Sequence, residues 1–400
     1  MHAPSPPATN TPARWFLALV IVIFTAAASA PTPMYQLYQQ SWHFSASMLT
    51  AVFAVYVLTL LISLLIFGSA SDYIGRKPVI FTALVFEIVA MVFFLIAKDV
   101  QTLLIARAIQ GFATGIATAV LGAALFDNDH HKGPITNAIA PLLGLASGAV
   151  ITGILVEYGP SPLHLSYLAM LLVMVVLALL LWGLPETATR RPGILKSLTP
   201  RVFVPETARA TMLEIAPANG SAWALGGFYL SLAPSVIARA TDAPSSLAGG
   251  FAVACLMLSG AVSVLIAQKR QPAETLLAGT FIQTLGIIVL VLGIGLGMLW
   301  VFLAGSILAG FGFGATFLGS IRTLLPRAEP HERGGLMAAF YVMSYLSFCI
   351  PALLAGKLVS IWGLIRTAEG YGIALVALTF LALVLQIRKR QQRVAATGKV

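Results

Sequence analysis

The residues most able to do chemistry in this chain form a short charged segment between two long apolar runs. Positions 68–77 read Gly-Ser-Ala-Ser-Asp-Tyr-Ile-Gly-Arg-Lys. Gly75 predicts a tight turn between Asp72 and the basic pair Arg76 and Lys77. A carboxylate and a guanidinium this close in sequence can form a charge-assisted hydrogen bond at the edge of a membrane.

Two further charged side chains, Glu87 and Arg107, lie inside apolar runs. Burial favours the neutral form of a carboxyl, which makes Glu87 a candidate proton carrier. An arginine inside a membrane is costly and is usually paired, and Arg107 on the next, antiparallel run is a candidate partner for Glu87. Two alternatives stay open: Glu87 could belong to a purely structural pair, and Arg107 could extend to the outer surface.

The composition defines a membrane protein. The chain of 400 residues is 58% hydrophobic and 10% charged, with a mean hydropathy of +0.92, whereas soluble domains carry about 25% charged residues. A spanning helix needs about 20 apolar residues, which predicts an all-α polytopic protein with twelve spans. The predicted spans are 15–38, 47–69, 78–97, 101–125, 134–157, 164–183, 218–238, 246–267, 274–294, 298–321, 335–361 and 370–388.

The net charge of +10 does not indicate a nucleic-acid partner, because its distribution follows the membrane. With the amino terminus inside, most Lys and Arg residues fall in loops on the cytoplasmic side. The opposite side receives Lys98, Arg239, Lys357 and Arg366. This asymmetry predicts that both termini are cytoplasmic.

The first 30 residues imitate a secretory signal, with Arg14 before an apolar stretch. We reject this interpretation because Pro31 would follow the cleavage point and only eleven spans would remain. Cys255 and Cys349 both lie in predicted spans, and we expect them to be small buried residues rather than a disulfide or metal ligands.

A long loop divides the chain into two halves. Residues 184–217 separate a first bundle of six spans, 1–183, from a second bundle with a basic tail, 218–400. The sequence from Val204 to Ile215 predicts the start of an amphipathic helix, which we expect to lie on the cytoplasmic membrane surface.

The halves repeat at offsets near 200 residues. Gly111-Phe-Ala-Thr-Gly115 corresponds to Gly310-Phe-Gly-Phe-Gly314, and Gly153 corresponds to Gly356. Two similar bundles related by an axis along the membrane normal, with a substrate site between them, are a common transporter layout.

Segment 68–77 resembles the loop between helices 2 and 3 of the major facilitator superfamily, Gly-x-x-x-Asp-x-x-Gly-Arg-Lys/Arg. The resemblance implies a conformational latch in which Asp72 pairs with Arg76 and faces the start of span 11 near Gly334–Met337. Gly68 would let the two halves approach closely. The alternative is that the basic pair only anchors the topology, which we favour for Lys77.

Two further segments resemble this family. Arg107-Ala-Ile-Gln110-Gly111 is similar to its Arg-x-x-Gln-Gly segment, which the family links to proton coupling. The glycines of span 5 resemble the helix-5 segment of drug–proton antiporters: Gly144, Gly148 and Gly153. Ala149 stands where that pattern has proline, and Thr152 replaces a glycine, which puts antiport in doubt. Plain helix packing is the alternative for these small residues.

The helices that line the cavity in this family are 1, 4, 7 and 10, with span 11 as a possible addition. Their polar and aromatic side chains predict an uncharged lining suited to an amphipathic or lipophilic solute. The candidate cavity residues are Tyr35, Gln110, Thr114, Trp223, Tyr229, Phe313 and Tyr345. Ordinary packing is the alternative for each of them.

Other motifs point away from enzyme chemistry. The sequence contains no phosphate-binding loop of the Gly-x-x-x-x-Gly-Lys-Ser/Thr type. The cluster Asp127-Asn-Asp129-His130-His131 is interpreted as a solvated loop. Glu332 and Arg333 fall in the corresponding loop of the second half, where they could instead make a second contact between the halves at the gate.

We therefore predict a monomeric secondary transporter in a bacterial inner membrane, with a small-molecule substrate and the lipid bilayer as its partners. No cofactor is expected beyond the proton gradient, and no enzymatic activity. The resemblance to the twelve-helix drug–proton antiporters favours proton-coupled efflux of lipophilic compounds. Uptake or facilitated diffusion of a small metabolite is the alternative, and a scaffold or sensor that transports nothing is a remote one.

Overall fold

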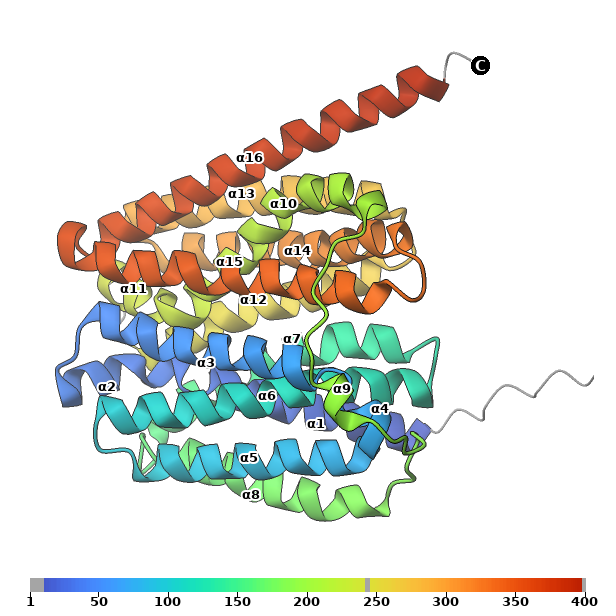
Figure 1. Ribbon diagram of the computed structural model, residues 1–400. Helices are drawn as coiled ribbons and strands as arrows, with labels where there is room; N and C mark the ends of the chain where they lie inside the picture. Colours follow the sequence, from blue (N-terminus) through green and yellow to red (C-terminus); the bar gives the residue numbers. More distant parts are fainter. Residues whose placement is uncertain (1–10, 242–244, 398–400) are drawn as a thin grey trace, which may run out of the picture.

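The computed structural model describes residues 11–241 and 245–397, which are helical with no strand in those ranges (Figure 1). Within them, eleven helices are long and apolar enough to cross a membrane. Counting α10 and α11, which meet at 65°, as one bent span gives twelve. The predicted all-α polytopic fold is thereby confirmed.

The first half contains six spans. Its elements are α1 (Thr11–Ser29), η1 (Thr32–Met34), α2 (Tyr35–Trp42), α3 (Ala46–Phe67), α4 (Ser71–Ile74), α5 (Arg76–Ile96), α6 (Val100–Asn128), α7 (Gly133–Tyr158), α8 (Leu165–Leu180) and η2 (Leu181–Gly183). The first span is interrupted at η1, because Pro31 and Pro33 cannot donate to the helical ladder. The predicted single helix 15–38 did not include this break.

The second half follows a linker. Its elements are α9 (Ile194–Ser197) in the linker, then α10 (Glu206–Ser231), α11 (Ala233–Ala240), α12 (Ser246–Ala267), α13 (Pro272–Leu296), α14 (Leu299–Leu324), η3 (Leu325–Arg327), α15 (Arg333–Trp362) and α16 (Leu364–Thr397). Most of these helices match the predicted spans within a few residues.

The end of the linker differs from the expected helix on the membrane surface. Residues 206–217 are the first turns of α10, which continues into the seventh span. Ala208 and Ile215 are fully buried in a cluster with Leu336 and Ala382 of the second half. Their apolar face packs on protein, which explains why the segment looked amphipathic in the sequence.

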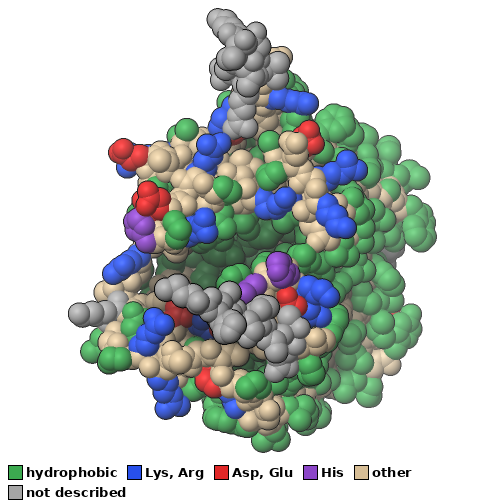
Figure 2. Space-filling model, turned by 90° about the vertical axis from the view of Figure 1, so that its right-hand side faces the viewer, with side chains coloured by type: hydrophobic (Ala, Val, Ile, Leu, Met, Phe, Trp, Pro, Cys, Tyr) green, Lys and Arg blue, Asp and Glu red, His purple; other side chains and the backbone are tan. Residues whose placement is uncertain are grey.

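The two ends of the helix bundle differ in charge. We call one the basic end; it holds loops 68–76, 129–132, 184–205, 268–271 and 325–332 and the described chain ends. The opposite, far end holds loops 43–45, 97–99, 159–164 and 298. Figure 2 looks at the basic end, where Lys and Arg side chains surround a hollow between the two halves, with hydrophobic side chains in its depth.

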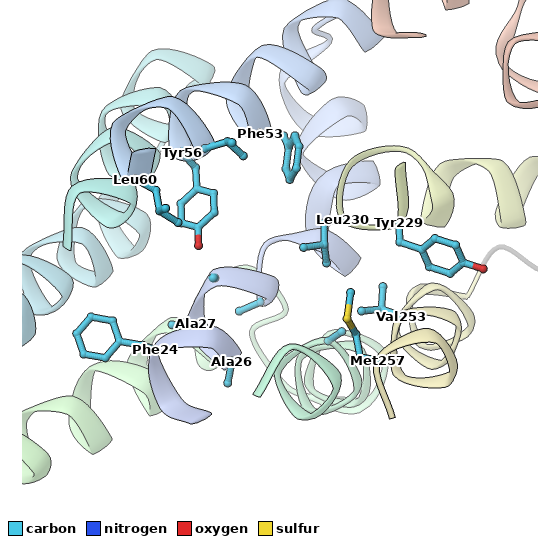
Figure 3. Packing of buried hydrophobic residues seen from close by; sticks show 14 of the residues in the cluster. Phe24, Ala26, Ala27, Phe53, Tyr56, Leu60, Tyr229, Leu230, Val253 and Met257 are labelled. Atoms are coloured by element: carbon cyan, nitrogen blue, oxygen red, sulfur yellow. The ribbon is translucent and has the colours of Figure 1, made fainter. Parts of the chain in front are cut away.

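The halves touch mainly through two helix pairs, α3 with α15 and α7 with α12, and more weakly where η1 meets α12, α3 meets α10 and α2 meets α11. One hydrophobic cluster includes buried residues of both halves, such as Phe24 and Tyr56 of the first and Leu230 and Met257 of the second (Figure 3). Five hydrogen bonds join the halves in the described part of the chain, and all lie in the part of the bundle toward the far end. The protein is therefore closed at the far end and parted at the basic end.

The repeated glycines occupy equivalent places in the two halves. A Cβ at Gly111 would overlap the backbone of Tyr56 on α3, and a Cβ at Gly310 would overlap the backbone of Leu256 on α12. The fourth span of each half thus packs directly on the second, as small-residue spacing permits in membranes.

Candidate functional site

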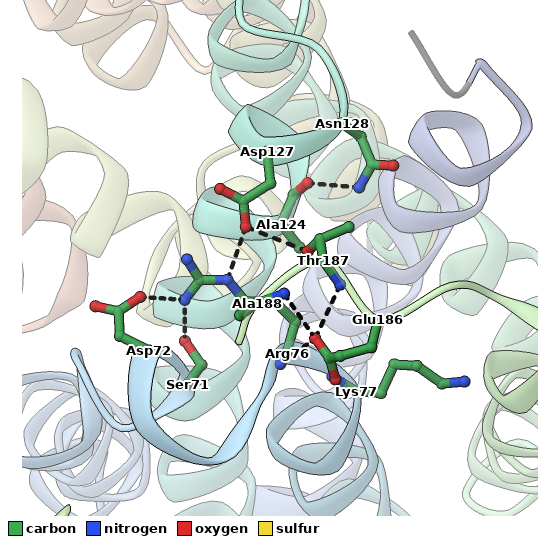
Figure 4. Close-up of polar contacts among 10 residues, drawn as sticks. All are labelled: Ser71, Asp72, Arg76, Lys77, Ala124, Asp127, Asn128, Glu186, Thr187 and Ala188. Carbon is green, nitrogen blue, oxygen red and sulfur yellow. Dashed lines mark hydrogen bonds and ion pairs between the residues drawn. The ribbon is translucent and has the colours of Figure 1, made fainter. Parts of the chain in front are cut away.

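The charged segment 68–77 folds around Arg76. Gly75 has a φ of +103°, which an L side chain rarely adopts, and it turns the chain from α4 into α5. Arg76 Nη1 donates to Asp72 Oδ1 at 2.5 Å, and its Nε donates to Asp127 Oδ2 at 2.9 Å (Figure 4). The guanidinium thus joins two carboxylates of the first half.

A carboxylate of the linker completes this site. Glu186 accepts the backbone N–H groups of Arg76 at 2.8 Å and Lys77 at 3.0 Å, at the N-terminus of α5 (Figure 4). A Cβ at Gly75 would lie 2.7 Å from Glu186 Oε2, so a larger residue would displace this carboxylate. Partial burial opposes ionisation, but the N–H donors of Ala188, Arg76, Lys77 and Thr187 outweigh it and lower the pKa of Glu186.

Lys77 has a different role from its neighbour. Its ammonium donates to the carbonyl oxygens of Trp182 at 3.0 Å and Leu184 at 2.6 Å, where the sixth span ends. This contact ties the linker to the start of α5.

The contact between Asp72 and span 11 is not formed in this conformation. Among the described residues, Asp72 forms an ion pair with Arg76, and the Asp72 side chain remains 51% exposed. The atoms within 4 Å of a Cβ at Gly68 belong to Leu64 of the same half, so Gly68 does not bring the halves together here. Instead, Phe203 of the linker packs against Gly335 at the start of α15.

The second-half loop is likewise not joined to the first half. Glu332 accepts the backbone N–H of Glu329 at 3.1 Å within its own loop, and Arg333 is exposed. The parting of the halves at the basic end explains both observations.

The cluster at 127–131 is solvated only in part: His130 and His131 are exposed, as the sequence suggested, but the two aspartates are not free. Asp127 binds Arg76, and Asp129 binds Arg14 Nη1 at 2.6 Å with its side chain 7% exposed. The backbone N–H of Lys132, helped by Arg14 and the N–H of His131, holds the pKa of Asp129 below its ordinary value. These aspartates fasten α6 to α1 and to the charged segment.

A polar network is buried between α1, α2, α5 and α6. Gln110 Nε2 donates to Glu87 Oε1 at 3.0 Å and to the carbonyl of Ala27 at 3.0 Å. Arg107 Nη1 donates to Gln110 Oε1 at 2.7 Å, and Nη2 donates to the Tyr35 hydroxyl. Glu87 is fully buried and Arg107 is 1% exposed.

This network changes two expectations. Gln110 lies between Glu87 and Arg107, and no ion pair between those two is found among the described residues. Arg107 does not extend to the surface; its guanidinium lies 4.9 Å from the ring centre of Tyr56. Glu87 Oε2 and Arg107 Nε have no hydrogen-bond partner in the described part of the chain.

An aromatic group lies in the second half near the junction of the halves. The ring centres of Trp223 and Tyr345 are 4.9 Å apart, and Phe348 lies 5.6 Å from Trp223. Phe348 also contacts Phe53 of the first half at 5.0 Å. Phe313 and Phe348 both lie against Gly226: a Cβ built there would be 3.7 Å from the Phe313 ring and 3.0 Å from the Phe348 ring.

The remaining predicted residues serve packing in this conformation. Thr114 donates to Gln110 O of its own helix, and the Tyr229 hydroxyl pairs with Ser306 inside the second half. A Cβ at Gly144 or Gly148 would overlap α1, whereas one at Gly153 would lie 3.1 Å from Leu247 Cα of the second half.

Sequence reasoning missed three kinds of residue. Glu186 was visible only as part of a loop, and Asp127 only as a surface charge. Tyr56 carried no signal beyond being one aromatic residue in an apolar helix. Each gains its role from a partner distant in sequence, which a local pattern does not reveal.

Two six-span halves that enclose a hollow at their junction define a secondary-transporter architecture. The chain belongs to the Major Facilitator Superfamily, whose family model matches residues 17–350. Among solved structures, it is similar to the crystal structure of the nucleoside transporter NupG, with a TM-score of 0.71 and 12% sequence identity. The match covers 93% of this chain and 99% of that chain, and at this identity it shows the shared fold alone.

Proposed function

We propose that this protein exports small lipophilic or amphipathic compounds in exchange for protons, by alternating access. The two halves rock about their junction, so that the hollow faces one side of the membrane and then the other. The positive-inside rule supports a cytoplasmic position for the basic end and both termini, and we propose a bacterial inner membrane as the location.

The observation that carries the proposal is the buried network of Glu87, Gln110 and Arg107. A proton on Glu87 changes what Gln110 Nε2 can donate to, and Gln110 also binds the carbonyl of Ala27 on α1. Arg107 binds the next carbonyl, that of Ala28, at 3.0 Å. Protonation thereby acts on the α1–α6 contact, beside the junction of the halves.

The aromatic group of Trp223, Tyr345 and Phe348 is the proposed solute contact. Its faces are uncharged and can stack on a flat apolar solute. Asp72 is the proposed latch at the basic end. When the halves close there, its exposed carboxylate faces the N-terminus of α15, where an anion is favoured.

The test uses purified protein in liposomes that contain a pH-sensitive dye and carry an imposed pH gradient. A panel of lipophilic cations and neutral antibiotics is added outside. We expect protons to leave as a compound enters. Glu87→Gln abolishes the pH dependence of this flux, whereas the exposed control Glu274→Gln retains it. Unchanged pH dependence in Glu87→Gln removes Glu87 from the mechanism.

Uptake of a small metabolite, by symport or facilitated diffusion, is the second candidate. Ala149 replaces the proline of the antiporter pattern, and Thr152 replaces a glycine, which favours this alternative. Protons that move in the same direction as the solute in the liposome experiment would support it. A chain that moves no compound of any class would instead be a scaffold or sensor.

A further inference from the structure

A carboxylate of the first half lies on a helix N-terminus of the second half at the far end. Glu157, in the last turn of α7, accepts the hydroxyl of Ser245 at 2.7 Å and the backbone N–H of Leu247 at 3.4 Å through Oε2. Ser245 is the residue that caps α12, since its side chain accepts the N–H of Ala248. One side chain therefore bridges the halves at a helix start.

The chemistry of this contact is favourable but weak. The first N–H groups of a helix lack intrahelical partners, and the aligned peptide dipoles place positive partial charge there. Glu157 is exposed, so solvent screens the attraction. An exposed charge at such a position changes an equilibrium by about two- to fivefold. A contact of this strength biases a conformation without locking it.

The position of Glu157 links it to the motion of the halves. One turn earlier on α7, Gly153 lies against Leu247, and Ala149 O would lie 2.5 Å from a Cβ at Gly250 on α12. The other hydrogen bonds between the halves in the described part join neutral side chains to backbone carbonyls. Glu157 therefore supplies the charged cross-half contact of this surface.

We propose that Glu157 is a far-end latch, a positioning residue that holds α7 against α12 while the basic end is open. Release of its bonds to Ser245 and Leu247 accompanies opening of the far end. The inference rests on the rocking motion of the proposed function and does not depend on the solute or the coupling ion.

The experiment measures the distance across the far end. Spin labels are attached at Lys98→Cys in the first half and Trp300→Cys in the second, both exposed positions, after Cys255→Ala and Cys349→Ala. Distance distributions are recorded by pulsed electron paramagnetic resonance in lipid nanodiscs, without any solute.

Glu157→Ala is expected to raise the population with a parted far end about two- to fivefold. Ser245→Ala raises it in the same direction, and the double variant adds little to either single change, because both remove one shared contact. Glu157→Gln retains an acceptor oxygen but no charge, and gives an intermediate shift.

Asp99→Ala is the matched control. Asp99 accepts the backbone N–H of Thr102 at the start of α6, so it is also a carboxylate on a helix N-terminus at the far end, but within one half. The Asp99→Ala substitution should leave the distance distribution across the far end unchanged. An unchanged distribution in Glu157→Ala, or an equal shift in Asp99→Ala, overturns the proposal. If Glu157→Ala does not fold, the comparison of Ser245→Ala with Asp99→Ala decides in its place.

Because no solute is present, the outcome is separable from that of the transport experiment. A shift in Glu157→Ala without proton-coupled flux would retain the latch and reject the proposed function. Proton-coupled flux with an unchanged distance distribution in Glu157→Ala would support the proposed function and reject the latch.

Discussion

The two ends of the molecule are held in different ways. At the far end, the halves touch directly through Ser47 with Gly356, Gln36 with Pro234 and Glu157 with Ser245. At the basic end, the ion pairs of the described residues join groups on the same side of the junction, as with Arg76 and Asp127 in the first half and Lys389 and Glu214 in the second.

This difference shows how the protein can move without losing its structure. The polar contacts that must break when the far end opens are a few hydrogen bonds, each worth about 0.5–1.5 kcal/mol net, and the apolar packing of α7 on α12 and of α3 on α15 must rearrange with them. The ion pairs and the buried network of the first half do not cross the junction and can remain intact. In the proposed rocking motion, the first half moves as a rigid body and the far-end junction is the surface that changes.

The largest expected effect comes from breaking that rigid body. Arg107→Met leaves Gln110 Oε1, the Tyr35 hydroxyl and the carbonyl of Ala28 without their shared donor. Loss of one member of a buried charged network costs about 3–5 kcal/mol. We expect a clearly lower melting temperature, measured by thermal denaturation in detergent. Exposed Arg239→Met serves as the control, and an equal loss in both variants would contradict the rigid-body interpretation.

The second prediction concerns a bulky substitution that should force the far end open. A Cβ at Gly356 would overlap the side chain of Thr50 on α3, so Gly356→Leu destabilises the closed far end by about 1–3 kcal/mol. Labels at positions 98 and 300 should report a longer mean distance. At Gly370 on α16 a Cβ meets no atom within 4 Å, and Gly370→Leu should leave the distance as it is.

The third prediction concerns a substitution that should weaken the attachment of the linker at the basic end. Glu186→Ala removes the carboxylate that caps α5 and fastens the linker, which costs about 1 kcal/mol by analogy with helix caps. Trypsin should then cleave the exposed linker after Arg190 about fivefold faster, whereas Pro192 protects the bond after Arg191. Glu206 pairs with Arg209 only at the surface, and cleavage as rapid in Glu206→Ala would argue against a specific role for Glu186.

The smallest effect is the pH dependence of the same contact. The pKa of Glu186 is lower in the folded protein than its ordinary value, which is about 4.3. Its ionised form therefore stabilises the linker above that value, and this contribution is lost as pH falls through the lowered pKa. Hydrogen exchange of residues 184–197, corrected for intrinsic rates, should rise below about pH 4. A rise in exchange that is already complete as the pH falls from 7 to 5, above the pKa of Glu186, would contradict the assignment of this effect to Glu186.

The fold could be predicted from the sequence because hydropathy and charge distribution are local signals. Long apolar runs and paired glycines such as Gly111 and Gly310 set the spans and the repeat. The bend between α10 and α11 and the break at η1 were missed, since an apolar run does not show where its axis changes direction.

The candidate sites were predictable only in part. The pair of Asp72 with Arg76 lies within one turn of helix and could be foreseen from spacing. The partners of Glu87 and Glu157 lie 23 and 88 residues away, and tertiary packing alone brings them together. The sequence also does not indicate which end is closed, because the same chain must fold into both conformations, one closed at the far end and one closed at the basic end.

The most direct measurement compares both ends of the molecule in the same membranes. One sample carries labels at positions 98 and 300 across the far end, and another carries them at His130→Cys and Arg327→Cys across the basic end. The account predicts that changing the pH changes the two distances in opposite directions, with one end closing as the other opens. Both distances changing together, or neither changing in a protein that transports, would contradict it.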